Sequence, residues 1–164
     1  MGDGLYYYGE LKNGYLHGKG IIRDENNKII YDGDFKFGKF DGEGNLYYIG
    51  GNHYIGEFRN GVQYGNGTLL DESNNKIYEG EFKFNKFEGK GKKYYSNEVL
   101  VYEGEFSSSL YQGYGKKYLL DGYYEGNFIN GEYHGKGALY YKNGKIWYYG
   151  DFQNGIQWRR NFLF

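Results

Sequence analysis

The sequence contains no cysteine and no proline, and only one methionine and three histidines among its 164 residues. Without cysteine, disulfide frameworks, thiolate zinc sites, iron–sulfur clusters and cysteine nucleophiles are excluded. Three histidines, His17, His53 and His134, leave little material for a histidine metal centre or a catalytic triad. Alanine occurs once, as Ala138. Because helices need Ala, Leu and Met in stretches free of glycine, the composition argues strongly against a helical protein.

The sequence also lacks an excess of positive or negative charge and lacks long apolar runs. The formal net charge is −1 and the pI is about 6.3, which gives no overall attraction to nucleic acid. The mean hydropathy is −0.86, and no run approaches the roughly 20 apolar residues of a membrane-spanning helix. The start of the chain matches neither a signal peptide nor an N-myristoylation signal. These observations predict a soluble cytoplasmic protein without a nucleic-acid partner.

Glycine and aromatic residues are abundant, with 30 Gly, 23 Tyr and 12 Phe. They recur as an aromatic residue, any residue, Gly, an acid and Phe, in copies that begin near residues 7, 31, 54, 78, 102, 124 and 148. Nine residues after the central glycine of each of the first six copies comes Gly-x-Gly, and the block between them never changes in length. A fixed period of this size indicates a repeat protein. The constant block is interpreted as a paired unit and the variable remainder as a loop.

Turn chemistry predicts that each unit is a β-hairpin, because Asn-Gly occupies the middle of four of the blocks. Closing the first hairpin at Asn13-Gly14 pairs Leu11 with Leu16, and the same register continues to place Tyr7 opposite Gly20. Later hairpins follow the same register, so each first-strand tyrosine is expected to cover a glycine of the partner strand. Alternation places Tyr, Gly and Phe on one face and acids with lysines on the other.

The repeated sequence, for example YEGEFKFNKFEGKG from residue 78, resembles the MORN (membrane occupation and recognition nexus) repeat. Six complete copies and one partial copy cover nearly all of the chain. The resemblance implies an all-β fold: an elongated, twisted, single-layer antiparallel sheet of tandem hairpins with a shallow groove. We therefore expect a single domain over residues 1–164, with residues 158–164 forming a C-terminal cap or contact segment.

No catalytic or cofactor site is predicted. The glycine-rich GKGKKYY at residue 89 has neither the third glycine nor the following helix that a phosphate-binding loop needs. The repeated acids are interpreted as a solvated face compensated by lysines, and the alternatives are a basic partner or a weakly held cation. An enzyme is not expected, and neither a cofactor nor a metal is predicted.

The favoured function is that of a non-catalytic scaffold whose aromatic groove binds an extended or helical segment of a partner protein, because a contiguous apolar groove on a soluble protein usually marks a binding surface. The alternative is that these rings only cover glycines and pack on one another. The rings predicted to line the groove are Tyr31, Phe35, Tyr54, Phe58, Tyr78, Phe82, Tyr102 and Phe106.

Stand-alone MORN arrays resemble components of cytoskeletal assemblies, membrane-associated baskets and the radial spokes of cilia. The resemblance therefore implies one or more protein partners in a larger cytoskeletal or axonemal assembly that can lie next to a membrane. It also raises an alternative function as a peripheral membrane adaptor that binds anionic lipid or phosphoinositide. The lysines assigned to that alternative are Lys90, Lys92, Lys93, Lys116 and Lys117.

The C-terminal end carries an apolar segment after the last repeat. Its apolar residues are Trp158, Phe162, Leu163 and Phe164. An open sheet leaves an unpaired strand at its edge. This segment is therefore predicted to cap the last strand, with a homodimer or end-to-end contact as the alternative.

Overall fold

The computed structural model describes residues 4–95 and 98–157, which form one open antiparallel sheet of fourteen strands. The strands are β1 (Tyr6–Lys12), β2 (Tyr15–Arg23), β3 (Ile29–Lys36), β4 (Lys39–Tyr47), β5 (His53–Arg59), β6 (Val62–Leu70), β7 (Lys76–Lys83), β8 (Lys86–Tyr94), β9 (Leu100–Ser107), β10 (Leu110–Leu119), β11 (Gly122–Ile129), β12 (Glu132–Tyr141), β13 (Ile146–Gln153) and β14 (Ile156–Gln157). Their order in the sheet is their order in the chain.

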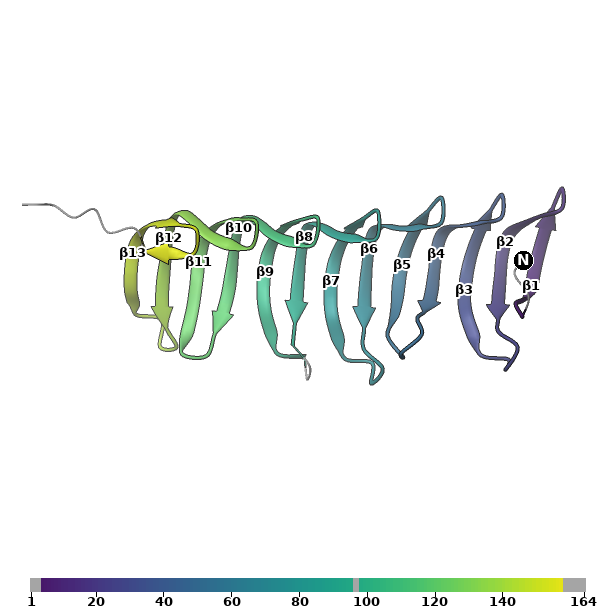
Figure 1. Cartoon of the computed structure of the whole chain (residues 1–164), viewed down its shortest axis with the longest axis horizontal. Coiled ribbons are helices and arrows are strands. Elements are labelled where there is room, and N and C mark those ends of the chain that lie inside the picture. Colours follow the sequence, from purple (N-terminus) through teal and green to yellow (C-terminus); the bar gives the residue numbers. More distant parts are fainter. Residues whose placement is uncertain (1–3, 96–97, 158–164) are drawn as a thin grey trace, which may run out of the picture.

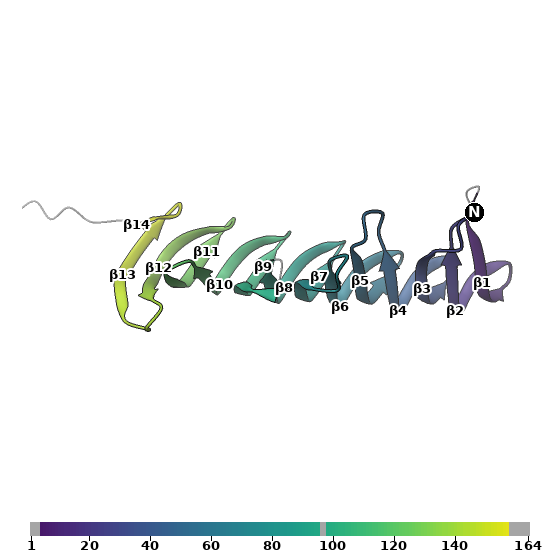
Figure 2. The same cartoon turned by 90° about the horizontal axis from the view of Figure 1, so that it is seen from below.

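The hairpins lie side by side in one row along the long axis of the molecule (Figure 1). The view turned by 90° shows the same single layer, with no second sheet packed against it (Figure 2). The described part of the chain contains no helix long and apolar enough to cross a membrane. The predicted all-β, single-layer sheet of tandem hairpins is confirmed.

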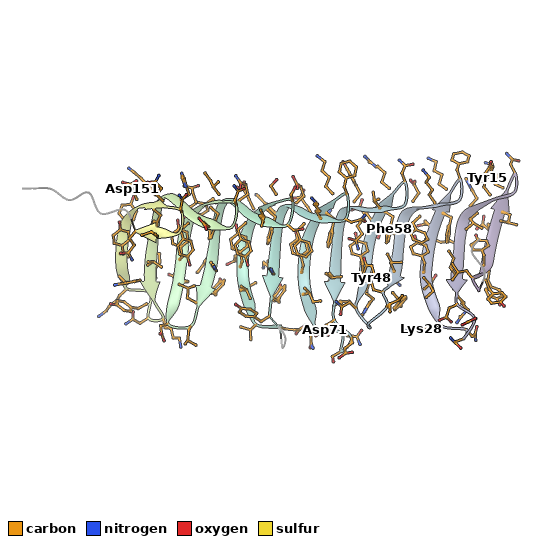
Figure 3. The ribbon with its side chains drawn as sticks, viewed as in Figure 1. Tyr15, Lys28, Tyr48, Phe58, Asp71 and Asp151 are labelled. Atoms are coloured by element: carbon orange, nitrogen blue, oxygen red, sulfur yellow. The ribbon has the colours of Figure 1, made fainter. Side chains whose placement is uncertain are left out.

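The hairpin turns lie along one long side of the sheet, at one end of the strands, and the joins between hairpins lie along the opposite long side. Figure 3 shows Tyr15, beside the first turn, at one edge, and Lys28 and Asp71, in two of the joins, at the opposite edge. At the predicted turns Asn13 and Gly14 both have positive φ, 52° and 78°, as a two-residue hairpin turn of this kind requires. Turns without asparagine reach the same conformation, with Phe37 at a φ of 51°.

The predicted register is correct next to each turn and wrong beyond it. Leu11 lies opposite Leu16 as expected, but Tyr7 lies opposite Ile22 and not opposite Gly20. The reason is a bulge in which the second strand carries two more residues than the first. A shift of two residues leaves every side chain on its original face, so the predicted division into an aromatic and a polar face still holds.

The predicted cover of glycine by tyrosine also survives, because the ring reaches diagonally across the strand pair. A Cβ atom added to Gly20 would collide with the ring of Tyr7, and one added to Gly44 would collide with the ring of Tyr31. Any larger residue in place of the glycines of this row would therefore clash with the tyrosine rings. The core consists of these tyrosines and the first-strand phenylalanines, all on one face of the sheet.

Candidate functional site: the groove on the aromatic face

The eight rings predicted to line the groove form its floor. They are 0–4% exposed. They pack edge to face along the array, with centroid distances of 5.0 Å between Tyr31 and Phe35 and 5.4 Å between Tyr31 and Phe58. These rings expose little area to a partner, and their proposed role in binding stays a prediction.

A second column of rings, which the sequence analysis did not assign to the site, lies above this floor. Each of these rings comes from the second strand of its hairpin and stacks on the core tyrosine at a centroid distance of 3.7–3.9 Å. They are Phe40, Phe87, Tyr111 and Tyr133, and all four are only partly buried. The signal that identifies them is an aromatic residue five positions after the first-strand phenylalanine, which recurs in four hairpins.

A further column on the same face alternates with the core tyrosines from strand to strand. Leu46, for example, lies between Tyr31 and Tyr54 in the register of the sheet. The members in chain order are Ile22, Leu46, Leu69, Lys93, Lys117 and Leu139. The groove is therefore apolar over strands β2 to β6 and basic over β8 and β10.

The column of second-strand rings is interrupted at Gln63, which occupies the aromatic position of the third hairpin. The interruption leaves a hollow of about 670 Å³ whose walls include Leu46, Leu69 and Phe87. The Gln63 side-chain amide donates a hydrogen bond to the Tyr48 hydroxyl at 2.5 Å. Tyr48 belongs to the join between β4 and β5, which stands away from the sheet (Figure 2).

The rim of this hollow presents apolar surface to solvent. Ile49, next to Tyr48, is fully exposed and lines the hollow. Asn85 and Ser109 supply polar groups at the opposite side. The hollow thus offers space for an apolar side chain and hydrogen-bonding groups around it, the usual composition of a binding site.

The structure does not bring the five predicted lysines onto one surface. Lys93 and Lys117 lie in the groove, and both of their Nζ atoms are 5.8 Å from the ring centroid of Tyr111. Lys90, Lys92 and Lys116 point to the opposite face of the sheet. The predicted set is split because neighbouring residues of a strand, such as Lys92 and Lys93 or Lys116 and Lys117, alternate between faces.

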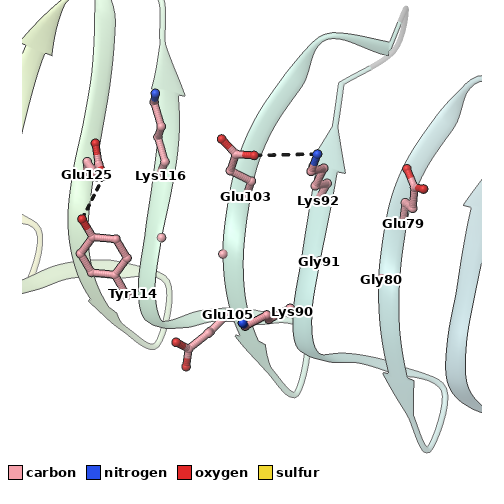
Figure 4. Close-up of a pocket in the computed structure, with 12 residues that line it drawn as sticks. Glu79, Gly80, Lys90, Gly91, Lys92, Glu103, Glu105, Tyr114, Lys116 and Glu125 are labelled. Carbon is pink, nitrogen blue, oxygen red and sulfur yellow. Dashed lines mark hydrogen bonds and ion pairs between the residues drawn. The ribbon is translucent and has the colours of Figure 1, made fainter. Parts of the chain in front are cut away.

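On that opposite face the lysines alternate with glutamates across five strands (Figure 4). The order across the sheet is Glu79, Lys92, Glu103, Lys116 and Glu125. Lys92 Nζ lies 4.0 Å from a Glu103 carboxylate oxygen. Opposite charges therefore lie next to each other along this row, and its lysines form no uncompensated basic patch.

In four hairpins the repeated acid has a structural role that the sequence analysis missed. The Glu81 carboxylate accepts a hydrogen bond of 2.9 Å from the Lys90 backbone N–H, and the Glu57 carboxylate accepts one of 2.8 Å from the Asn66 N–H. Both N–H groups follow a bulge glycine of positive φ. The acids therefore satisfy the backbone of the bulge, which accounts for their recurrence without a basic partner or a cation.

Burial changes the acidity of the tyrosines that form the groove. It raises the pKa of the Tyr124 hydroxyl to about 12, and it also raises the pKa of Tyr111 and Tyr133 above the ordinary value near 10. All three phenols are therefore neutral at physiological pH and keep a hydroxyl donor.

The histidines do not converge on a site. His17 packs edge to face on Phe37 at 5.7 Å, and His53 stacks on Tyr47 at 5.4 Å. No group of three or more histidine or carboxylate residues within 4–95 and 98–157 is arranged to hold a metal ion. The predicted end-contact residues Trp158, Phe162, Leu163 and Phe164 lie outside the described residues.

The repeat model of one known family matches this arrangement. The MORN repeat matches the chain six times, at residues 7–28, 31–53, 54–76, 78–98, 102–122 and 124–146. The chain belongs to the MORN repeat family. Each match begins at or within two residues of the first-strand tyrosine of a hairpin, and this MORN array continues beyond the last match into β13 and β14. A comparison with curated proteins gives no match. Membership of the family supports a general role as a binding module.

Proposed function

We propose that this MORN array is a non-catalytic scaffold that binds an extended or helical segment of a partner protein along its aromatic face. The observation that carries the proposal is the hollow at Gln63, where an otherwise continuous column of rings is interrupted and apolar walls are open to solvent. The segment would lie over Leu46 and Leu69 and contact the ring of Phe87. The core rings beneath would hold these side chains in place.

The accessible side chains favour a protein segment as the ligand. Large aromatic and aliphatic side chains lose little conformational entropy on binding, and such residues dominate protein interfaces. Asn85, Ser109 and Tyr48 surround the apolar walls; each side chain accepts one internal hydrogen bond and has a donor group left for a polypeptide backbone. The groove runs along the array, which suits a ligand that is long and narrow.

A pair of labelled variants tests the proposal. A photo-crosslinking amino acid placed at Ile49, on the rim of the hollow, is expected to capture one defined segment of a partner protein in a cell lysate. The same amino acid at Ile55, which is exposed on the opposite face, is expected not to capture that segment. Mass spectrometry of the crosslinked peptides identifies the segment and its position.

Leu69→Glu supplies the second arm of this test, because it places a charge in the groove. We expect it to abolish capture from position 49, whereas Ile55→Glu leaves capture unchanged. Thermal melting of both variants checks that the fold is intact. Equal capture from both faces, or capture that Leu69→Glu does not alter in a folded protein, would refute the proposal.

The proposed setting is a cytoskeletal or axonemal assembly of the cytoplasm. It follows from the resemblance of stand-alone MORN arrays to components of such assemblies. Fractionation of cells that express the tagged protein tests it. We expect the protein in the detergent-insoluble cytoskeletal fraction, and its complete recovery in the soluble fraction would contradict this setting.

Peripheral membrane binding is the alternative function, and the arrangement of the lysines disfavours it. A bilayer contacts one face at a time, and each face of the sheet presents only part of the lysine set. Flotation with vesicles that contain phosphoinositide tests this alternative, and no co-flotation at low salt would end it.

A further inference from the structure

Two positive charges in the groove have no carboxylate partner. The ion pairs found among the described residues are Lys19–Asp34, Lys76–Glu79 and Lys92–Glu103, and none of them includes Lys93 or Lys117. Glu103 and Glu125, which lie opposite the adjacent Lys92 and Lys116 in the sheet, face the other side. The groove therefore carries two ammonium groups over aromatic rings, where water screens charge less than at an open surface.

Neutral phenols accompany these ammonium groups. The Nζ atom of Lys117 lies 5.5 Å from the ring centroid of Tyr133 and 5.8 Å from that of Tyr111. In the part of the chain that the structure describes, neither of these tyrosines uses its hydroxyl in a hydrogen bond to another residue, unlike the core tyrosines beneath them. This stretch of the groove thus offers ammonium and hydroxyl donors and no acceptor charge, which suits a carboxylate.

The spacing of the charges is set by the sheet. Lys93 and Lys117 flank Tyr102 on the neighbouring strands, so their backbones are two strand spacings apart, about 9.6 Å. Leu46 and Leu69 continue the same column toward the N-terminal end at the same interval. A helix advances about 10.5 Å in seven residues and an extended chain about 10 Å in three. A segment that lies along the array can therefore meet successive positions of this column with regularly spaced side chains.

We propose that the groove selects an acidic, amphipathic segment of a partner protein, with apolar side chains over Leu46 and Leu69 and two carboxylates over Lys93 and Lys117. This inference rests on the proposed function and names the chemistry of its ligand. Charge complementarity at such a site fixes the direction and register of the ligand as well as adding affinity. Because one half of the groove is apolar and the other half is basic, the segment can bind in only one direction along the array.

An anionic membrane is the less suitable ligand for these two lysines. Their ammonium groups lie in the aromatic groove, and the other three lysines of the sequence cluster face the opposite side among glutamates. A bilayer attracts each lysine only weakly and needs several on one surface, whereas a peptide needs only two carboxylates at the right interval. The geometry therefore favours the peptide.

Selection from a displayed library of random peptides about 24 residues long, enough for a helix to span all four positions, tests the inference without a known partner. The full chain is used as wild type and as three variants, Lys93→Glu/Lys117→Glu, Lys93→Gln/Lys117→Gln and, as the matched control on the opposite face, Lys92→Gln/Lys116→Gln. We expect the wild type and the control to enrich peptides with apolar residues and two acids spaced by three or seven positions. The groove variants are expected to bind those peptides at least about tenfold more weakly.

The outcomes separate this inference from the function on which it rests. Enriched peptides that carry no acids, or that bind the folded Lys93→Gln/Lys117→Gln variant as tightly as the wild type, would overturn the inference and leave the scaffold proposal standing. No enrichment by any variant would overturn both. Co-flotation with phosphoinositide vesicles that depends on Lys93 and Lys117, without selection of acidic peptides, would assign the two lysines to a membrane instead.

Discussion

The tyrosine that opens each hairpin uses its ring and its hydroxyl for different purposes. The ring covers two glycines, and the hydroxyl donates a hydrogen bond to the backbone carbonyl three residues further on, as Tyr78 does to Glu81 at 2.9 Å. The same bond, 2.8–3.2 Å long, recurs in all seven hairpins. The acceptor carbonyl lies at the bulge, where the ladder of backbone hydrogen bonds is interrupted. Phenylalanine would fill the same space but leave this carbonyl without that partner.

Replacing Tyr78 by phenylalanine is therefore expected to lower the free energy of unfolding by about 1–2 kcal/mol, the usual effect of a lost buried hydrogen bond. Tyr149→Phe is the matched control, because that hydroxyl belongs to a side chain that is 67% exposed. Urea unfolding followed by fluorescence measures both. Equal stability of the two variants would show that the hydroxyl contributes nothing to the fold.

The pH dependence of stability follows from the same residues. Burial raises the pKa of Tyr124 to about 12, and it raises the pKa of the other core tyrosines in the same direction. A phenol whose pKa is higher in the folded chain contributes its full stabilisation below pH 10, and that contribution decreases as the pH rises from 10 toward 12. We expect unfolding in this window, together with late ionisation of the core tyrosines in the ultraviolet absorbance. Ionisation of all 23 tyrosines near pH 10 with the fold intact would contradict the prediction.

At the scale of the hairpin, the turns hold neighbouring hairpins together. The N–H of the second turn residue donates to a carbonyl of the preceding hairpin, as from Gly61 to Phe40 at 2.8 Å and from Gly131 to Tyr111 at 2.9 Å. A side chain of the preceding hairpin often accepts from the first turn residue as well, and the Glu88 carboxylate accepts from the Ser108 N–H at 3.0 Å. Hairpins are thus connected at their turns in addition to the strand ladder.

The side chain at this connection matches the first residue of the turn. Where the turn begins with a polar residue, an acid or amide accepts from its N–H; the pairs are Asp41–Asn60, Glu88–Ser108 and Gln112–Asn130. Where the turn begins with phenylalanine, a ring packs on it instead; the pairs are His17–Phe37 and Tyr64–Phe84. At these five positions the variable side chain is therefore explained by its contact with the next hairpin.

Removing the acceptor at one connection tests this explanation. Glu88→Ala is expected to lower the free energy of unfolding by about 1 kcal/mol and to speed amide hydrogen exchange at Ser108. Glu88→Gln is expected to retain protection, because Gln112 makes the equivalent bond to Asn130. Exchange followed by nuclear magnetic resonance provides the measurement, and identical exchange at Ser108 in all three proteins would be incompatible with the bond.

At the scale of the whole molecule, each strand pairs only with its neighbours in the chain, so the fold has no central core. The buried rings are distributed along the row of hairpins, and the end strand β1 is mostly exposed. Arrays of this kind gain stability from each repeat and from each interface between repeats. Internal hairpins have two such interfaces and end hairpins have one.

Hydrogen-exchange protection is accordingly expected to be highest in β7 and β8 and to decrease toward β1 and β13. The physical reason is that an end hairpin opens by breaking one interface, whereas a central hairpin must break two. Residue-resolved exchange under native conditions measures the gradient. Equal protection along the array would indicate a single cooperative unit.

Much of the candidate site could be predicted from the sequence, and each error in the prediction has a specific physical cause. Tyr78 and Phe82 were correctly placed on the aromatic face because side chains alternate along a strand. Their burial could not be foreseen, because it depends on Phe87 stacking over Tyr78 at 3.8 Å. The hollow at Gln63 was missed because its walls Leu46 and Leu69 lie beyond the bulge, where the predicted register was wrong, although Gln63 itself pairs with Phe58 in the correctly predicted part.

The sequence by itself determined the repeat, the hairpins, their order and the two faces of the sheet. These features follow from periodicity, turn residues and alternation, which are local properties of the chain. Only the tertiary structure decided which residues lie opposite one another beyond the bulge, which rings are buried, and how the five predicted lysines divide between the two faces. Those properties depend on contacts between strands that are distant in sequence, and a two-residue bulge changes such contacts without changing the pattern along either strand.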